Sequence, residues 1–264
     1  MLRFQSHKNR STEVSQFLDR AHGMGSFRIN AYTTLINGLV IDGVWPLLDA
    51  LYITATDTQA NANLNLVSSS YPLIETGSPT FTADKGYTLV DANTVNYVLT
   101  GFNPNTASSP KYTLNSAHYS IWQSNSAAVS ASIGIGGTSP FNIVEVILIN
   151  FSGTTNIYRS HTGQTGGATG ASGATNDGNF VVNRPDSATQ TAYRSGIFEG
   201  TETRNQDGAV PNVGLGFGCE NDSGTVICRG GVYRSGSIGS ALNNTTALAL
   251  HTRISDYMTA VGAT

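Results

Sequence analysis

The segment YTLNSAHYSIWQS, residues 112–124, decides the fold class because its side chains alternate in type. Successive side chains of a β strand point to opposite faces. His118, Ser120 and Trp122 would therefore share one face, and the two apolar residues between them would occupy the other. Aromatic and β-branched residues are also enriched in strands. The segment predicts a β strand with two different faces.

Segments of the same kind lie on both sides of it. Each carries β-branched or aromatic residues and is bounded by glycine, proline, asparagine or serine, which favour turns. They are residues 80–89, 97–104, 128–137, 142–150, 156–161, 179–185, 192–200, 213–220 and 225–235. A spacing of roughly 8–15 residues between such segments is typical of a jelly-roll β-sandwich. We therefore expect a mainly β protein.

The composition agrees with many short strands. Of 264 residues, 39% are hydrophobic and only 12% are charged, while 29 are glycine and the net charge is −3. No basic patch indicates nucleic-acid binding, and no lysine run indicates an anionic membrane. The first residues, MLRFQSHKNRSTEVSQF, lack the apolar core of a signal peptide. We therefore expect a soluble protein that is made in a cytoplasm.

Helical patterns occupy the N-terminal fifth of the chain. Residues 11–21 begin with a candidate cap at Ser11, residues 28–42 place apolar side chains on one helical stripe, and residues 44–52 continue the pattern with Pro46 in a first turn. We expect two or three short helices here. Residues 1–56 would form a docking or oligomerisation segment packed on a sandwich spanning residues 57–264.

The C-terminal pattern is the clearest local one. Apolar residues recur three and four apart from Ala247 to Val261, after a candidate cap at Asn244 or Thr245. Gly262 follows the last apolar residue, which is where glycine commonly ends a helix. The sequence predicts one amphipathic helix that packs onto the sheets.

The two cysteines, Cys219 and Cys228, flank a turn-like stretch. A hairpin turning at Ser223-Gly224 would place them directly opposite each other. Two reduced, buried cysteines are one interpretation, and a disulfide formed in an oxidising medium is the other. A zinc site is disfavoured because no histidine or third cysteine lies in this stretch.

A glycine-, serine- and threonine-rich tract, HTGQTGGATGASGATNDGN, spans residues 161–179. Such a composition cannot fill a core, so we expect an exposed loop between strands. Exposed loops on rigid sheets are common binding sites, although a simple hairpin tip is the more frequent case.

Several phrases of the sequence resemble those of bacteriophage and prophage virion structural proteins with a concanavalin A-like (lectin/glucanase) jelly roll. These phrases are SIGSALNNTTALALHTRISDYMTAVG (237–262), LINGLVIDGVWPLLDALYI (35–53), NLVSSSYPL (65–73), SPTFTADKGYT (78–88) and LTGFNPNTASSPKYTLNSAHYSIW (99–122). The resemblance implies a concanavalin A-like jelly roll with short N-terminal helices and one C-terminal helix. It also implies a virion context, as a head-decoration, fibre or tail component assembled in the bacterial cytoplasm.

No catalytic constellation is visible in the sequence. The nearest pair of glutamates, Glu199 and Glu202, would face opposite sides of a strand and lacks the spacing of the glycosidases with this fold. No histidine pair has a metal-binding spacing, and no nucleophile elbow or phosphate loop is present. We therefore expect no enzyme, and a polysaccharide depolymerase is disfavoured.

Glycan binding is the second hypothesis for function. Sugar sites combine an aromatic surface with amide or carboxylate groups. The candidate residues are His118, Trp122, Tyr158, Tyr193, Asp177 and Asn179, although most aromatic residues of a sandwich lie in its core. Calcium held by loop carboxylates and amides is a weaker alternative to having no cofactor, and the candidates are Asp177, Asn179, Asp207, Asn221 and Asp222.

Assembly is the first hypothesis, and host-surface attachment is compatible with it. The expected partners are other virion proteins, further copies of the chain in a homo-oligomer such as a trimer, and a host-surface glycan. Neither nucleic acid nor a membrane is expected as a partner.

Overall fold

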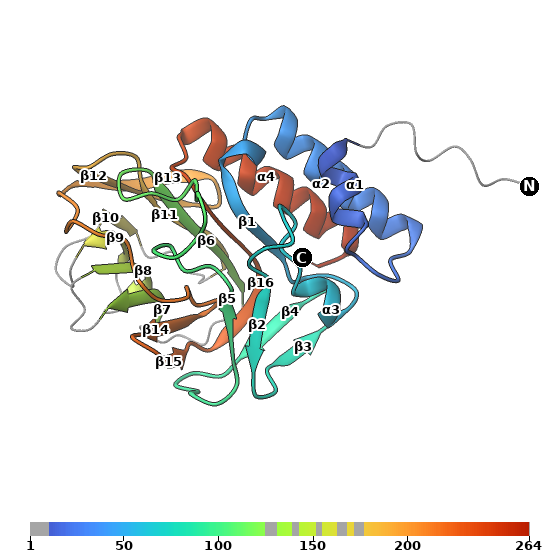
Figure 1. Ribbon diagram of the computed structural model, residues 1–264, viewed down its shortest axis with the longest axis horizontal. Coiled ribbons are helices and arrows are strands. Elements are labelled where there is room, and N and C mark those ends of the chain that lie inside the picture. Colours follow the sequence, from blue (N-terminus) through green and yellow to red (C-terminus); the bar gives the residue numbers. More distant parts are fainter. Residues whose placement is uncertain are drawn as a thin grey trace, which may run out of the picture.

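The computed structural model describes residues 11–124, 131–138, 143–151, 155–162, 168–171 and 177–263. Figure 1 shows two β-sheets packed face to face, with helices α1, α2 and α4 lying over the outer side of the larger sheet. The chain therefore has three layers, and two apolar cores lie between them.

The larger sheet runs through the middle of the molecule. Its strands follow the order β13-β12-β11-β6-β16-β4-β3, and β1 also pairs with β16. Their bounds are β1 Leu48–Ile53, β3 Thr80–Thr82, β4 Gly86–Leu89, β6 Ala117–Ser124, β11 Gly178–Arg184, β12 Thr189–Arg194, β13 Ile197–Thr203 and β16 Gly231–Gly239. All pairings within it are antiparallel.

The second sheet follows the order β10-β9-β8-β7-β14-β15. It comprises β7 Ala131–Thr138, β8 Ile143–Phe151, β9 Thr155–Thr162, β10 Ala168–Ala171, β14 Cys219–Asp222 and β15 Thr225–Cys228. A separate pair joins β2, Leu73–Thr76, to β5, Tyr97–Thr100. The predicted jelly-roll sandwich is confirmed.

Strand β6 shows how the sequence divides the two cores. Tyr119 and Ile121 are buried in the core between the sheets. Trp122 packs on the opposite side, in the core between the large sheet and the helices. The alternation in residues 112–124 therefore corresponds to two covered faces. The second sheet covers one face of β6, and the helices cover the other.

The helical layer contains α1 (Thr12–Leu18), α2 (Ser26–Ile41) and α4 (Asn244–Val261), and a short helix α3 (Gln59–Ala62) lies at the edge of the sheet. The rings of Phe17, Tyr32 and Tyr257 connect α1, α2 and α4. The centres of successive rings lie 4.7 Å apart. Among the described residues, no helix is long and apolar enough to cross a membrane.

The C-terminal helix prediction is confirmed, but its predicted cap at Asn244 or Thr245 is wrong. Asn243 is the N-cap, because its side chain accepts a hydrogen bond from the Thr246 amide, and Asn244 and Thr245 lie in the first turn of the helix. Gly262 ends the helix in the left-handed conformation with φ 71°, which costs glycine little because it has no Cβ. The helix buries Ala247, Leu250, Ile254, Tyr257 and Met258.

One helix prediction is wrong. Residues 44–52 contain only a 3-10 turn, Trp45–Leu47, and Leu48–Ile53 form strand β1. This strand pairs with β16, placing Leu51 opposite Ser237 and Ile53 opposite Ser235. Pairing with a strand almost 190 residues away, which the local pattern cannot show, decides its structure. The N-terminal segment therefore contributes a strand to the main sheet.

The glycine-rich tract is not one continuous loop. His161 and Thr162 end β9, residues 168–171 form β10, and Asn179 already belongs to β11. Residues 163–167 and 172–176, on which most of the loop prediction falls, lie outside the described residues.

Candidate functional site

An open cleft lies where the β11–β12 hairpin meets the start of α4. Its volume is about 400 Å³, within the range of small-molecule sites. Three separate segments line it, namely the end of β11, the strand β12 and the first turn of α4. The lining residues are Asn183, Pro185, Thr191, Tyr193, Leu242, Asn243, Asn244 and Thr245. We call this hollow the cap cleft.

Asn183 holds the segments of the cap cleft together. Its side chain is fully buried, and its amide nitrogen donates to Thr191 Oγ1 at 2.8 Å and to the Leu242 carbonyl at 3.1 Å. Its amide oxygen accepts from the Leu242 N–H at 2.7 Å. Three hydrogen bonds thus tie β12 and the segment before α4 to the floor of the cleft.

The capping interaction of α4 determines which groups face the cleft. Asn243 Oδ1 accepts from the Thr246 N–H at 2.9 Å, and Thr246 Oγ1 accepts from the Asn243 N–H at 2.9 Å. The cap therefore engages the Asn243 side chain. The next two residues, Asn244 and Thr245, are exposed, so their amide and hydroxyl groups are accessible to a ligand.

Tyr193 forms the aromatic part of the lining. The residue is only 3% exposed, and its ring packs edge-to-face on Phe198, with ring centres 6.0 Å apart. Burial raises the pKa of Tyr193 above its ordinary value, so the phenol stays protonated and can donate a hydrogen bond at neutral pH. Tyr193 supplies a rigid wall rather than a broad stacking platform.

The lining of the cap cleft contains no charged side chain. Arg184, which follows Asn183, is fully buried on the other side of the sheet, and its Nε donates to the Ser160 carbonyl of β9 at 2.8 Å. Amide, hydroxyl and phenol groups next to apolar Pro185 and Leu242 match the hydroxyl and C–H groups of a sugar. The cleft chemistry therefore favours an uncharged, hydroxyl-rich ligand.

Only Tyr193 of the six predicted sugar-contacting residues lines the cap cleft. His118 is fully buried, with Nδ1 2.5 Å from the Ser240 carbonyl and Nε2 3.0 Å from Ser237 Oγ. Burial lowers its pKa to about 4. The neutral ring therefore donates from Nδ1 and accepts at Nε2. It offers no surface to a sugar.

Trp122 and Asn179 lie opposite each other on β6 and β11. Helix α4 covers them, because Trp122 stacks on His251 with ring centres 5.1 Å apart. Both side-chain amide atoms of Asn179, Ser235 Oγ on the other side of Trp122 and His251 Nδ1 are buried without a hydrogen-bond partner. Their burial closes this polar cluster to a glycan.

Tyr158 and Asp177 lie apart from the cleft. Tyr158 is fully buried in the second sheet and donates a hydrogen bond to the carboxylate of Glu199. Asp177 is exposed before β11, and its carbonyl accepts from Arg194 at 3.3 Å. The six predicted residues are therefore not assembled into one site.

The carboxylates of Glu199 and Glu202, weighed above as a catalytic pair, accept hydrogen bonds from Tyr158 and Gln190 respectively. Within the described part of the chain, no three histidine, cysteine, aspartate or glutamate side chains gather where they could hold a metal ion.

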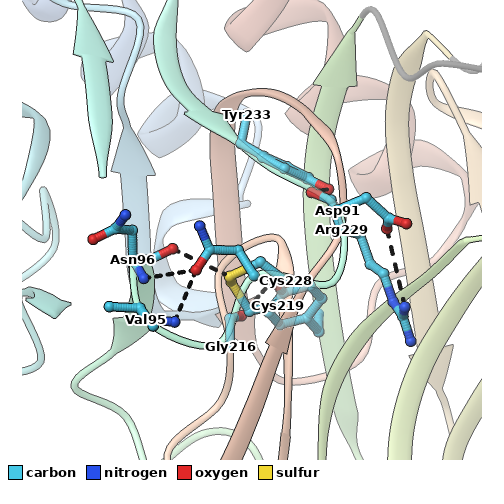
Figure 2. Close-up of a disulfide and its surroundings, with 10 residues drawn as sticks. Asp91, Val95, Asn96, Gly216, Cys219, Cys228, Arg229 and Tyr233 are labelled. Carbon is cyan, nitrogen blue, oxygen red and sulfur yellow. Dashed lines mark hydrogen bonds and ion pairs between the residues drawn. A yellow bond between two sulfur atoms is a disulfide. The ribbon is translucent and has the colours of Figure 1, made fainter. Parts of the chain in front are cut away.

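The cysteine hairpin has the predicted geometry, and the disulfide alternative is the one observed. Cys219 pairs with Cys228 across β14 and β15, and a disulfide joins them. Figure 2 shows the bond beside Asn96, whose carbonyl oxygen lies 3.8 Å from Cys228 Sγ. The disulfide thus closes the hairpin next to the segment that leads into β5.

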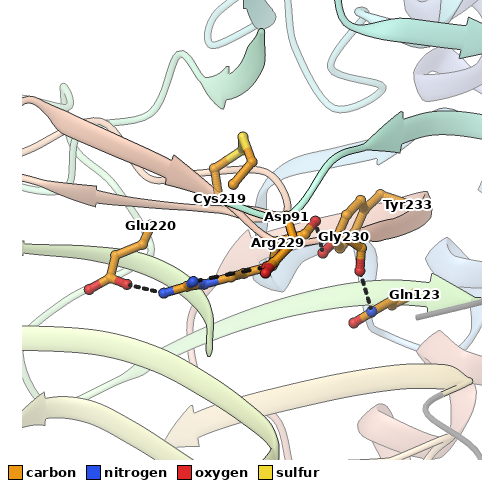
Figure 3. A network of polar contacts seen from close by, with 8 residues as sticks. Asp91, Gln123, Cys219, Glu220, Arg229, Gly230 and Tyr233 are labelled. Carbon is orange, nitrogen blue, oxygen red and sulfur yellow. Dashed lines mark hydrogen bonds and ion pairs between the residues drawn. A yellow bond between two sulfur atoms is a disulfide. The ribbon is translucent and has the colours of Figure 1, made fainter. Parts of the chain in front are cut away.

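Arg229, which follows the β14–β15 hairpin, makes several polar contacts beside it. Its guanidinium lies 3.4 Å from Glu220 and 4.0 Å from Asp91, as Figure 3 shows. Tyr233 donates to the Arg229 carbonyl at 3.0 Å. These contacts fix the hairpin against β16.

Sequence reasoning missed seven of the eight residues that line the cap cleft. Asn244 and Thr245 were recognised only as helix-capping residues, and Asn183 only as part of a strand. Two polar stretches, NRPDSATQT (183–191) and NNTT (243–246), carry most of the relevant side chains. Nothing in either stretch indicates that the other lies beside it.

The comparisons with known proteins identify a fold and no family. No protein-family model matches the chain, and no curated protein sequence matches it at a significant level. The chain is similar to the Trypanosoma rangeli sialidase in complex with 2,3-difluorosialic acid, with a TM-score of 0.55 and 8% identity, over 84% of this chain and 38% of that one.

Two further similar structures are toxin domains. The receptor-binding domain of botulinum neurotoxin C/D mosaic serotype has a TM-score of 0.51 and 11% identity, over 79% of this chain and 51% of that one. The serotype D binding domain has a TM-score of 0.50 and 10% identity, over 79% and 52%. The chain thus spans about half or less of the length of each. At these identities the likeness establishes the fold alone, a jelly-roll β-sandwich.

Proposed function

We propose that the protein is a glycan-binding module and that the cap cleft is its binding site. The observation that carries the proposal is an open cleft of about 400 Å³ lined by amide, hydroxyl and phenol groups without a charged side chain. The fold is shared with the receptor-binding and sialidase structures named above, which supports a binding role. The proposal involves no catalysis.

The disulfide supports a place of action outside a reducing cytoplasm. Disulfides persist in oxidising surroundings and are rare in the cytosol, and Cys219 and Cys228 are bonded here. We propose that the module acts on a surface exposed to the medium, where host glycans are found.

A glycan array tests the proposal directly. We expect binding to at least one uncharged glycan, with an affinity that changes little between low and high salt because no charged group lines the cleft. Asn244→Arg should abolish binding by filling the cleft. Thr259→Arg introduces the same side chain at an exposed position of α4 outside the lining, and this variant should bind like the unmodified protein.

Either of two results would contradict the proposal. One is the absence of binding to every glycan on the array by correctly folded protein. The other is binding that Asn244→Arg leaves intact, because the sugar would then occupy a different part of the surface.

Virion assembly is the second candidate function, and the similar structures named above are not virion proteins. Its support is the sequence resemblance together with large apolar side chains exposed on the helical layer and the adjoining hairpin, namely Phe27, Ile41, Leu248, Ile197 and Phe198. Large apolar groups exposed on one layer of the molecule favour a protein partner. A density map of intact particles tests this proposal, and absence of the chain from purified virions would contradict it.

A further inference from the structure

A second hollow adjoins the cap cleft along α4. Its volume is about 360 Å³, and it is lined by Asp42, Thr245, Leu248, Ala249, Thr252 and Arg253. Thr245 lines both hollows. We call this second hollow the outer hollow. A ligand that fills the cap cleft and extends past Thr245 would therefore enter the outer hollow.

The wall of the outer hollow is a regular stripe of α4. Thr245, Leu248 or Ala249, and Thr252 follow one another at intervals of three and four residues, which places them on one side of a helix. Leu248 is 51% exposed. The stripe alternates hydroxyl and apolar groups, as the two kinds of surface of a sugar ring require.

The charges in the outer hollow neutralise each other. Arg253 donates to the Asp42 carboxylate from Nε at 2.7 Å and from Nη2 at 3.2 Å. The arginine stem crosses α2 at Gly38, where a Cβ atom would lie 2.6 Å from Arg253 Cδ. Glycine at this position lets the arginine lie flat, so the ion pair forms a fixed wall that can hydrogen-bond to hydroxyl groups without attracting a net charge.

We propose that the cap cleft and the outer hollow are adjoining subsites, and that the ligand is an uncharged oligosaccharide of at least two units. This inference rests on the proposed function and specifies the ligand of the same site. The first unit occupies the cap cleft beside Tyr193 and Asn244. The next unit passes Thr245 and lies on Leu248 and Ala249, within reach of the Arg253–Asp42 pair.

Calorimetric titration with sugars of increasing length tests the inference. The probes are the monomer, dimer and trimer of N-acetylglucosamine, of glucose and of mannose. In at least one series we expect the dimer to bind about tenfold or more tightly than the monomer, because the second unit binds from a position already fixed by the first.

Variants separate the two subsites. Ala249→Arg fills only the outer hollow, so the dimer and trimer should fall to the affinity of the monomer, which should stay within about twofold of its original value. Asn244→Arg should remove binding of every length, and Thr259→Arg should change nothing.

The outcomes distinguish this inference from the proposed function. Equal affinity for monomer and trimer, or an equal loss for all lengths in Ala249→Arg, overturns the two-subsite arrangement while leaving glycan binding in place. Binding that survives Asn244→Arg overturns the proposed site itself. Absence of binding in all three series overturns the inference, and the glycan array then decides the function separately.

Discussion

Asn183 is the residue on which the cap cleft depends most. Its buried amide makes three hydrogen bonds that join β11, β12 and the segment before α4. Because the amide nitrogen and the amide oxygen of Asn183 both bond within the protein, Asn183 contributes to function by positioning other residues. The groups left for a ligand belong to Asn244, Thr245 and Tyr193, which the Asn183 contacts hold around one space.

Asn183→Ala should therefore destabilise the protein and impair glycan binding together. The change leaves buried groups of Leu242 unpaired, each at a cost of about 1–3 kcal/mol. Urea unfolding should show a loss of at least about 2 kcal/mol. Asn244→Ala is the matched control, because this exposed asparagine should change stability by less than about 0.5 kcal/mol. Equal stability of the two variants would show that Asn183 does not hold the cleft.

His118 predicts a pH dependence of stability. Burial lowers its pKa to about 4, whereas a histidine in an unfolded chain titrates near pH 6.5. Between these values the unfolded chain binds a proton that the native protein excludes, so falling pH favours unfolding. The contribution, about 3 kcal/mol in all, is complete above about pH 6.5 and is lost as the pH falls towards 4.

Denaturant unfolding at a series of pH values checks this expectation. His161, whose pKa burial lowers to about 3, acts in the same direction. His118→Gln should therefore reduce the dependence of the unfolding free energy on pH between 6.5 and 4 without abolishing it. The same slope in both proteins would mean that the native His118 ring takes up its proton as readily as the unfolded chain does.

At the scale of single elements, α4 could be predicted from the sequence and β1 could not. Apolar spacing, a polar capping residue and a terminal glycine are all local, and they place the helix within two residues of its observed bounds, Asn244–Val261. The stretch 48–53 has helix-compatible spacing, yet its backbone pairs with β16. Tertiary pairing overrides local preference there.

The β14–β15 hairpin carries a stability prediction at this scale. Its disulfide closes a loop with a sequence separation of nine residues. In the chain-entropy account, a loop of this length is worth about 2–3 kcal/mol. Reduction, or the pair Cys219→Ala and Cys228→Ala, should lower the free energy of unfolding by that amount. Because the hairpin lies apart from the cap cleft, glycan binding should persist at temperatures where both forms are folded.

For the whole molecule, the jelly roll is readable from the sequence and the cap cleft is not. The alternation of side-chain types in segments such as residues 112–124 predicts strands with two different faces. The repeated turn residues predict that these strands are short and numerous. The cleft requires residues 183–193 to meet residues 242–245, which no periodicity records. The predicted aromatic set failed for a related reason. The helical layer covers Trp122, and the opposing sheet covers Tyr158, so Trp122 is partly buried and Tyr158 fully buried although each was expected to face a ligand.

The helical layer links stability to function across the molecule. Helix α4 is held on the sheet by Leu250, Ile254, Tyr257 and Met258, and its exposed side lines both hollows. Glycan binding should consequently raise the thermal midpoint of the whole domain, because a ligand that binds only the folded state stabilises it. An unchanged midpoint at ligand concentrations far above the dissociation constant would argue against a site on α4.

A crystal structure of the protein with the oligosaccharide that binds it most tightly tests the central claim most directly. We expect one sugar unit in the cap cleft, in contact with Tyr193, Asn244 and Thr245, and a second unit over Leu248 and Ala249. A sugar bound elsewhere on the molecule, with both hollows empty, would contradict it.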